Sequence, residues 1–258
     1  MTELTNQMST PYNRAHHGFA VVAACFVFLL IVAGALVTSS KPGQPVHLEL
    51  LVEEYSAKVT LDILLPRLLG PEASFTVHAF DGRAQLLSRL EQRLRGYRRY
   101  PENTRVLDLV DRDNDDCLEL KARLERAAKS AGLPTLSTAR GAPETSDPIR
   151  VCNRIACEEL EAWFLGDPAA LSQAYPKVKP SYADQARHRA PDAVSGGTWE
   201  ALERLLRRAG YYRERTRLPK VEVARAIAPH LDPDRTNSPS FRAFATGVRR
   251  LAGGLSRN

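Results

Sequence analysis

Three short segments of the chain have the length and pattern of β-strands. Residues 47–53 (HLELLVE) are apolar for most of their length, as expected of a buried strand in a parallel sheet. Residues 74–80 alternate apolar and polar positions, and residues 104–110 (TRVLDLV) are again mostly apolar. Each segment is followed by a polar stretch with acidic residues, which predicts that the strand ends there.

Between these segments the apolar residues recur at the spacing of helices. Residues 57–69 follow Ser56, a predicted N-cap, and Pro66 is expected to kink or shorten this helix. Residues 83–96 carry leucines at helical spacing, and a third helix is expected to end at Gly132. Strands that alternate with helices predict an α/β fold with a parallel sheet of about four strands flanked by helices.

The second half of the chain is predicted to be mostly helical. A fourth strand is expected at residues 149–152, a helix at 157–165 and a long excursion at 176–197. Further helices are predicted at residues 198–209, 221–230 and 239–252. We therefore expect an α/β core at residues 46–152. Residues 153–258 form a helical extension, which begins with an acidic helix that contains a tryptophan.

The N-terminal residues 1–45 differ from the rest. Residues 18–38 carry no charge and could cross a hydrocarbon core of about 30 Å as an apolar helix. One interpretation is a transmembrane anchor that tethers a cytoplasmic catalytic domain to the inner membrane. The alternative is that translation begins near Val46, so that residues 1–45 are a start-site artefact and the domain is not tethered.

The composition is that of a folded globular protein, with 43% apolar and 26% charged residues, and it excludes disorder throughout. The formal net charge of +6 favours a polyanionic partner such as nucleic acid. The four cysteines form no C-x-x-C pair, and we interpret them as reduced thiols.

Arginines concentrate around residues 83–99 and 204–220, and the second region includes two adjacent tyrosines. Guanidinium groups bind phosphates and aromatic rings stack on bases. Charge on the outer face of a helix is most often only solvated, which is the alternative here. The candidate nucleic-acid contacts are Arg83, Arg93, Arg98, Arg99, Arg207, Arg208 and Arg215.

Acidic residues follow two of the predicted strands. Glu53 ends the first strand, and Asp111 and Asp113 follow the third. Ligands of open α/β sheets bind at the carboxyl ends of the strands, and residues two apart in extended chain project to the same side. Carboxylate oxygens suit Mg²⁺ or Mn²⁺. The pattern therefore predicts a divalent metal site with Glu53, Asp111 and Asp113 as its catalytic residues.

Three neighbouring aspartates are harder to assign. Asp115 and Asp116 precede a helix, whose N-terminal dipole favours a carboxylate as a cap. We prefer the cap for Asp115 and keep Asp116 as a candidate metal ligand. Asp108 lies inside an apolar strand and would need a partner if it were buried.

Several of these segments together resemble a known family. They are the strand end Val52-Glu53-Glu54, the later Asp111-Arg112-Asp113 and the run RIACEELEAWFLGD at residues 154–167. They are similar to the bacterial family called domain of unknown function 4276, over almost all of the chain that follows residue 45. That family is grouped with Toprim-like proteins, and it resembles the nuclease half of overcoming-lysogenization-defect enzymes. The resemblance implies a Toprim-like sheet.

The resemblance also implies roles for individual residues. Glu53 matches the Toprim glutamate, a metal ligand or general acid/base, and Asp111 and Asp113 match the Toprim aspartate pair. Glu159 and Glu161 fall in the acidic-tryptophan motif and are added as candidate metal ligands; the alternative is that they are solvated beside a buried tryptophan. Many Toprim domains carry glycine where this chain has Glu54, so the detailed geometry departs from that pattern.

The leading hypothesis is a Mg²⁺- or Mn²⁺-dependent phosphodiesterase that acts on DNA or RNA. The resemblance implies a place in antiphage defence, with a separately encoded ATPase as partner. One alternative is a membrane-anchored D-x-D glycosyltransferase, because an anchor, a short stem and paired aspartates describe that class too. Another is a non-catalytic, Toprim-like regulatory protein. A receiver-type phosphorelay domain is disfavoured because it gives Asp113 no role.

Overall fold

The computed structural model of the protein describes residues 45–71, 73–138 and 149–253. They contain one four-stranded sheet, in the order β2-β1-β3-β4, and all its neighbouring strands are parallel. The strands are β1 (His47–Val52), β2 (Ser74–Ala79), β3 (Thr104–Asp111) and β4 (Val151–Ala156). The α/β class and the parallel four-stranded sheet are therefore confirmed.

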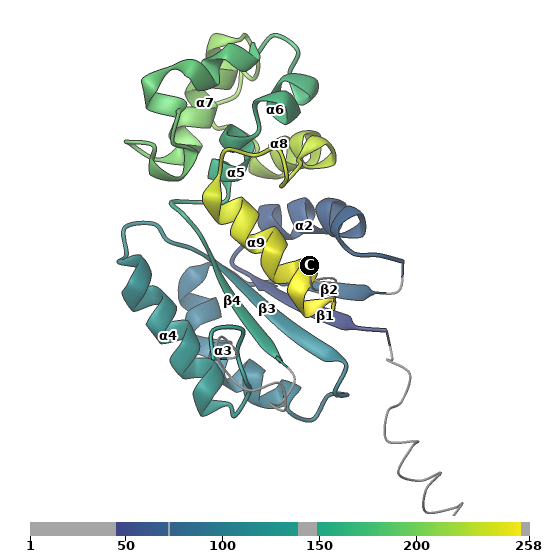
Figure 1. Ribbon diagram of the computed structural model, residues 1–258. Helices are drawn as coiled ribbons and strands as arrows, with labels where there is room; N and C mark the ends of the chain where they lie inside the picture. The colour runs from purple at the N-terminus through teal and green to yellow at the C-terminus, as the bar shows by residue number, and fades with distance from the viewer. Residues whose placement is uncertain (1–44, 72, 139–148, 254–258) are drawn as a thin grey trace, which may run out of the picture. The chain divides into compact units, whose positions relative to one another are not determined.

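Helices cover both faces of this sheet (Figure 1). One face carries α3 (Arg83–Tyr97) and α4 (Cys117–Ser130), whose buried leucines pack on Leu51 and Val110. On the other face, α2 (Tyr55–Leu68) and the C-terminal α9 (Pro239–Leu251) belong to a second and larger apolar cluster. Helix α9 packs against β4, so the end of the chain returns to the core sheet.

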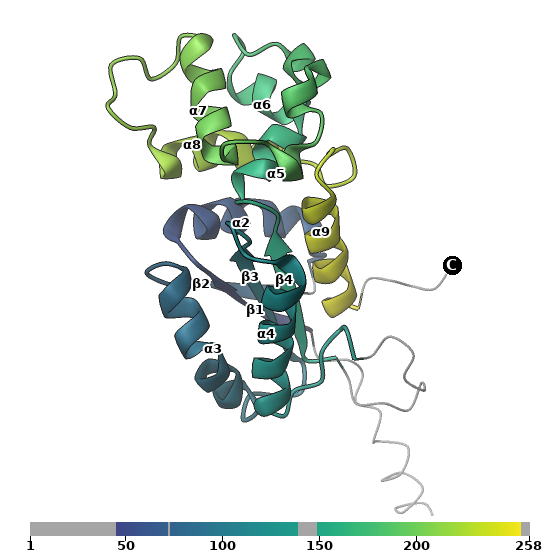
Figure 2. The ribbon, with the colours of Figure 1, turned by 90° about the vertical axis from the view of Figure 1, so that its left-hand side faces the viewer.

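The remaining helices are short and lie beyond one end of the sheet (Figures 1 and 2). They are α5 (Glu161–Gly166), α6 (Pro168–Ala174), α7 (Thr198–Arg208) and α8 (Lys220–Ile227). Three 3₁₀ turns, η1 (Pro180–Asp184), η2 (Ala186–His188) and η3 (Pro191–Ala193), occupy the predicted excursion, and η4 (Ala228–His230) follows α8. From residue 45 onward, the described residues form one compact unit.

The structure differs from the prediction between β4 and α5. The strand expected at 149–152 continues to Ala156, and the helix expected from residue 157 begins only at Glu161. The backbone N–H groups of Arg112 and Asp113 donate to the carbonyls of Ala156 and Glu158, at 2.9 Å each. These two hydrogen bonds hold the segment after β4 in a non-helical conformation, in which Glu158 has φ +63°. A sequence window that contains only 157–165 has no information about that partner segment.

One prediction about the start of α2 also needs correction. Helix α2 begins at Tyr55, so Ser56 is its second residue and not its N-cap. The Ser56 hydroxyl instead donates to the carboxylate of Glu54. Pro66 lies inside α2, which ends at Leu68, close to the predicted end.

The predicted membrane anchor at residues 18–38 lies outside the described residues. In the described part of the chain, no helix is long and apolar enough to cross a membrane. Cys117, Cys152 and Cys157 are free thiols.

The contact between α9 and β4 yields a stability prediction. A Cβ atom added at Gly247 would lie 2.7 Å from Nε of Arg154 and 2.9 Å from Sγ of Cys152. We expect Gly247→Ala to lower the free energy of unfolding by about 1–3 kcal/mol, because the well-packed contact must open. The matched control is Gly96→Ala in α3, where nothing lies within 4 Å of the added Cβ. Urea denaturation should show the control unchanged or slightly more stable, and equal losses in both variants would contradict this prediction.

Candidate functional site

The carboxyl ends of β1 and β3 bring the first two predicted site residues together. Val52 pairs with Leu109 in the sheet, so the residues that follow each strand leave the same edge. Glu53 is only 9% exposed, and its Oε1 atom accepts a hydrogen bond from the backbone N–H of Asp111 at 2.9 Å. The Glu53 side chain therefore points toward β3 and not away from the sheet.

The carboxylates at this edge repel one another. Burial is the main cause that raises the pKa of Glu53 to about 7; Asp113 adds to it, and the hydrogen bond from Asp111 opposes it. The pKa of Asp111 lies well above its usual value, because burial and then Glu53, Glu161 and Glu54 raise it. Several negative charges thus share a small volume, which is the situation that a bound cation relieves.

Asp113 comes from the same loop but is held differently. Its φ is +49°, a left-handed conformation that is uncommon for aspartate, and its N–H donates to the carbonyl of Glu158. Its Oδ2 atom lies 3.1 Å from Nη1 of Arg83, which also contacts Asp115. Arg83, the first residue of α3, therefore neutralises the exposed side of the loop and holds Asp113 in place.

Helices α5 and α8 supply the opposite side of the site. Glu161, the first residue of α5, is 3% exposed, and burial raises its pKa to about 7 although Lys220 opposes the shift. The Nζ atom of Lys220 lies 3.2 Å from Glu54 and 3.7 Å from Glu161. It also lies 5.2 Å from the ring centroid of Trp199. Burial lowers the pKa of Lys220, but Glu161 and Glu54 raise it above its usual value, so this lysine is a cation.

Two predicted metal ligands, Asp116 and Glu159, accept hydrogen bonds at the starts of helices. Asp116 is the N-cap of α4, and its Oδ1 atom accepts from the N–H groups of Leu118 and Glu119 at 2.8 and 2.9 Å. Glu159 accepts from the Thr198 hydroxyl and from the Trp199 N–H, both at 2.9 Å, at the start of α7. The cap was expected at Asp115, which pairs with Arg83 instead.

The chemistry of the donors suits a hard divalent cation. Glu53, Asp111 and Glu161 offer only carboxylate oxygens, the ligands that Mg²⁺ and Mn²⁺ prefer. In the described residues, however, no group of three or more His, Cys, Asp or Glu side chains is arranged to hold a metal ion directly. The residues fit such an ion by type and charge. Ligation would require Glu53 to exchange its hydrogen bond with the Asp111 backbone for the cation.

A family model decides where the chain belongs. The model for the domain of unknown function DUF4276 matches residues 52–249. The protein is a member of the DUF4276 family. A search of curated proteins found no match. The solved C-terminal region of the OLD protein of Xanthomonas campestris pv. campestris matches at 16% identity, over 80% of this chain and 95% of that one, with a TM-score of 0.39. A likeness at that TM-score carries no argument about function.

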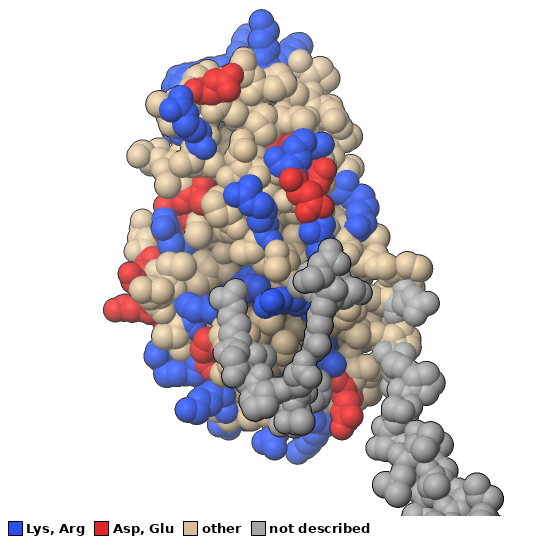
Figure 3. All heavy atoms as spheres, viewed as in Figure 1, with Lys and Arg blue, Asp and Glu red and all other residues tan. Residues whose placement is uncertain are grey.

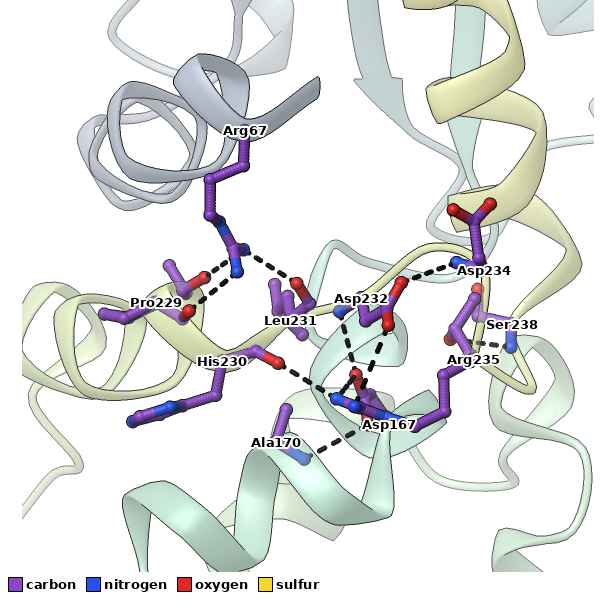
Figure 4. A network of polar contacts seen from close by, with 12 residues as sticks. Arg67, Asp167, Ala170, Pro229, His230, Leu231, Asp232, Asp234, Arg235 and Ser238 are labelled. Carbon is purple, nitrogen blue, oxygen red and sulfur yellow. Dashed lines mark hydrogen bonds and ion pairs between the residues drawn. The ribbon is translucent and has the colours of Figure 1, made fainter. Parts of the chain in front are cut away.

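The acidic-tryptophan motif of this DUF4276 protein is a packing element. The Trp163 ring is fully buried, stacks on Phe241 at 4.8 Å and donates from Nε1 to the Ser240 hydroxyl at 3.1 Å. Asp167, which ends the motif, is 0% exposed and accepts from both Nε and Nη2 of Arg235 (Figure 4). The motif therefore attaches α5 and α6 to α9 and to the segment before it.

The basic residues of the DUF4276 protein gather over α3 and α4 and again near α7 (Figure 3). Arg93 lines a hollow with Arg89, Tyr97 and Tyr100, while Arg98 and Arg99 are exposed at the end of α3. Arg207 is committed to structure, because it pairs with Glu203 and donates to the carbonyls of Tyr212, Arg215 and Thr216. Arg215 lies 3.5 Å from Glu222, and Arg208 lines a small cavity described below.

The sequence pattern did not identify Lys220 or Trp199 as residues of the site. Glu54 was noted only as a departure from the Toprim pattern, in which many domains carry glycine. Lys220 lies 166 residues from Glu54 along the chain, and no local pattern connects them. In the structure, a partly buried lysine lies between two carboxylates and next to a tryptophan ring. This arrangement can be recognised only once the positions of α7 and α8 are known.

Proposed function

We propose that this protein is a divalent-metal-dependent phosphodiesterase that acts on DNA or RNA. One observation carries the proposal. The carboxylates of Glu53 after β1, Asp111 at the end of β3 and Glu161 at the start of α5 come together at the carboxyl edge of a parallel sheet, where burial, followed by the neighbouring negative charges, raises the pKa of Asp111. Clusters of this kind suit Mg²⁺ or Mn²⁺ together with substrate phosphate.

Each residue has a role in this proposal. Glu53 and Asp111 would hold the cation, with Glu161 as a further oxygen donor. When bound, the cation would polarise a phosphoryl oxygen and lower the pKa of a coordinated water. Lys220, a cation beside Glu161, would bind a substrate phosphate oxygen next to the cation. Arg83 acts as a positioning residue, because it orients Asp113.

A second candidate is a non-catalytic protein that keeps the fold with a weakened site. Two observations favour it. The Glu53 carboxylate accepts a hydrogen bond from the backbone N–H of Asp111, and the Asp113 carboxylate forms an ion pair with Arg83. A protein of this kind would not bind Mn²⁺ at the cluster, which separates it from the first candidate.

The test uses the full-length chain with Mn²⁺ or Mg²⁺, and with a chelator as the blank. Labelled single-stranded DNA, duplex DNA and RNA should be cleaved only with metal. Asp111→Asn should reduce the rate at least about a hundredfold, because it removes a charge that the cation needs. Calorimetric titration of Mn²⁺ gives a second readout, and the same variant should lose this binding.

The matched control is Asp62→Asn, which changes an exposed aspartate paired with Lys58 on α2. It should cleave nucleic acid and bind Mn²⁺ like the wild type. If the wild type does not bind Mn²⁺, the metal-dependent proposal fails. Binding of Mn²⁺ without cleavage of any of the nucleic acids would keep the metal site and contradict nucleic acid as the substrate.

The family resemblance adds a partner to this proposal, a separately encoded ATPase that acts in antiphage defence. The expected result is that such an ATPase co-purifies with the tagged chain and raises the cleavage rate. Full activity of the isolated chain, unchanged by the ATPase, would remove the partner from the proposal while leaving the phosphodiesterase in place.

A further inference from the structure

A small, partly open cavity lies between η2 and α7, in a part of the molecule that the metal site does not use. Its volume is about 50 Å³. One water molecule needs about 10–15 Å³ of such space, so the cavity can hold a small polyatomic group and is too small for a base or a sugar. The lining residues that matter here are Arg187, His188, Ser195, Arg204 and Arg208.

His188 is the first sign that this cavity has a ligand. Its side chain is 7% exposed, and its Nδ1 atom is buried without a hydrogen-bond partner in the described residues. The ring packs edge-on against Tyr182, with the centroids 5.6 Å apart, and this contact fixes its orientation. A buried polar atom without a partner destabilises the fold unless a ligand or a water completes it.

The charge around His188 is the second sign. Burial lowers the pKa of His188, and the positive charges of Arg187, Arg204 and Arg208 lower it further. Arg187 donates to Gln185, a neutral acceptor, and in the described part of the chain none of these arginines forms an ion pair. Arg207, one position before Arg208, is by contrast paired with Glu203.

The geometry of α7 explains why these arginines meet. Arg204 and Arg208 are four residues apart on this helix, so they lie on the same face one turn apart. Like charges at this spacing destabilise a helix when nothing lies between them. Arg187 approaches the same space from η2. The site therefore has converging guanidinium groups, a hydroxyl from Ser195 and an imidazole nitrogen, all of which can donate hydrogen bonds to an anion.

We propose that this cavity binds a terminal phosphate of a nucleic acid. The inference rests on the proposed function, because it identifies the substrate as a strand whose end carries a phosphomonoester. A terminal phosphate bears more negative charge than an internal phosphodiester, and it has three free oxygens for the surrounding donors. The cavity size excludes the nucleoside, so the rest of the strand continues outside it.

Helix α7 connects this cavity to the carboxylate site. The helix starts at Thr198, beside Trp199, whose ring centroid lies 5.2 Å from Nζ of Lys220 in the carboxylate site, and Arg204 lies six residues beyond Thr198. At 1.5 Å per residue this is about 9 Å along the helix axis. A strand held by its end in the cavity would therefore be cleaved only a few nucleotides from that end.

The experiment measures binding by the full-length chain in a chelator, so that it does not depend on cleavage. Three short single strands of identical sequence carry a 5′-phosphate, a 3′-phosphate or no terminal phosphate. The wild type should bind one of the phosphorylated strands at least about tenfold more tightly than the unphosphorylated strand. The double variant Arg204→Gln/Arg208→Gln, which keeps the length of the side chains, should lose this preference. His188→Phe should weaken it.

The control is Arg217→Gln, an exposed arginine that does not line the cavity, and it should keep the preference. Circular dichroism and thermal denaturation check that each variant is folded. Equal affinity of the wild type for all three strands, or a preference that survives in a folded double variant, overturns the proposal.

A second arm separates this inference from the proposed function. Inorganic phosphate is added at constant ionic strength, and the melting temperature of the wild type is compared with that of the double variant. If phosphate stabilises only the wild type but no strand binds, the cavity is an anion site and the nucleic-acid function fails. If phosphate has the same effect on both proteins, the cavity proposal fails.

Discussion

Asp167→Ala is expected to lower the free energy of unfolding by about 3–5 kcal/mol. The Asp167 side chain is fully buried, and its carboxylate accepts four hydrogen bonds. Two come from Arg235, one comes from the N–H of Ala170 in α6, and one comes from the N–H of Asp232 (Figure 4). Alanine would leave all of these donors without their acceptor.

Several losses add up at this position. Removing a helix N-cap costs about 1 kcal/mol, and α6 uses Asp167 as its cap. Hydrogen bonds to a charged group contribute about 1.5–3 kcal/mol each when the group is buried. The substitution would also remove the hydrogen bonds that join Asp232 and Arg235 to the start of α6. Urea denaturation of the full-length chain measures the loss.

A matched control is available in the same region. Arg249 forms a bidentate pair with Asp234 at 2.7 and 2.8 Å, and 34% and 69% of their side chains are exposed. Arg249→Ala should change the free energy of unfolding by less than about 1 kcal/mol, because solvent screens exposed pairs. If both variants lose the same stability, burial does not set the strength of the Asp167 network.

The periodicity of the sequence predicted most of the core. The leucines of α3 recur at helical spacing, and β1 and β3 are nearly continuous apolar runs, as expected of strands that are buried on both faces. The prediction failed where a distant segment decides the local structure. Residues 157–160 are helix-like in composition, but hydrogen bonds from the loop after β3 hold this segment in a non-helical conformation, in which Glu158 has φ +63°. The helix therefore starts at Glu161 and not at residue 157.

The candidate site was predictable to the same extent and for the same reason. Glu53 and Asp111 follow adjacent parallel strands, and sheet topology alone brings such positions together. The role of Asp116 as a cap and the contact of Glu159 with α7 depend on neighbours that a pattern does not identify. Lys220 belongs to a helix without a diagnostic motif, and its place between Glu54 and Glu161 follows only from how α8 packs.

The sequence pattern does not explain why an aspartate, Asp108, lies inside an apolar strand. Its surroundings in the folded protein indicate its protonation state. It is 0% exposed in β3, and both of its carboxylate oxygens lack hydrogen-bond partners in the described residues. It pairs in the sheet with Asn153, whose Oδ1 atom also lacks a partner. Burial raises the pKa of Asp108 to about 7, although Lys121 opposes the shift. Burial therefore favours the neutral, protonated form of Asp108, which lies beside Asn153 because side chains at directly paired positions are neighbours on one face of the sheet.

The sign of the pH dependence follows from this shift. The pKa of an unfolded aspartate is about 3.9, so between that value and about 7 the folded state keeps a proton that the unfolded state has released. The stability that Asp108 contributes is therefore fully present below about pH 4 and is lost as the pH rises through about 7. Above about pH 7, the folded wild type must either keep a charged Asp108 carboxylate buried or open to expose this carboxylate to solvent.

Asp108→Asn should remove this loss. The amide keeps the shape of the carboxyl group, can donate to Asn153 at every pH and carries no charge. We expect the variant to be about 2–4 kcal/mol more stable than the wild type near pH 8, and nearly equal to it near pH 4. The site carboxylates Glu53 and Glu161 titrate in both proteins, so the difference between the two denaturation curves isolates Asp108. Asp184→Asn, a substitution of an exposed aspartate, should leave the curve unchanged. A difference between Asp108→Asn and the wild type that does not vary with pH would show that Asp108 is charged in the folded state, held there by Lys121.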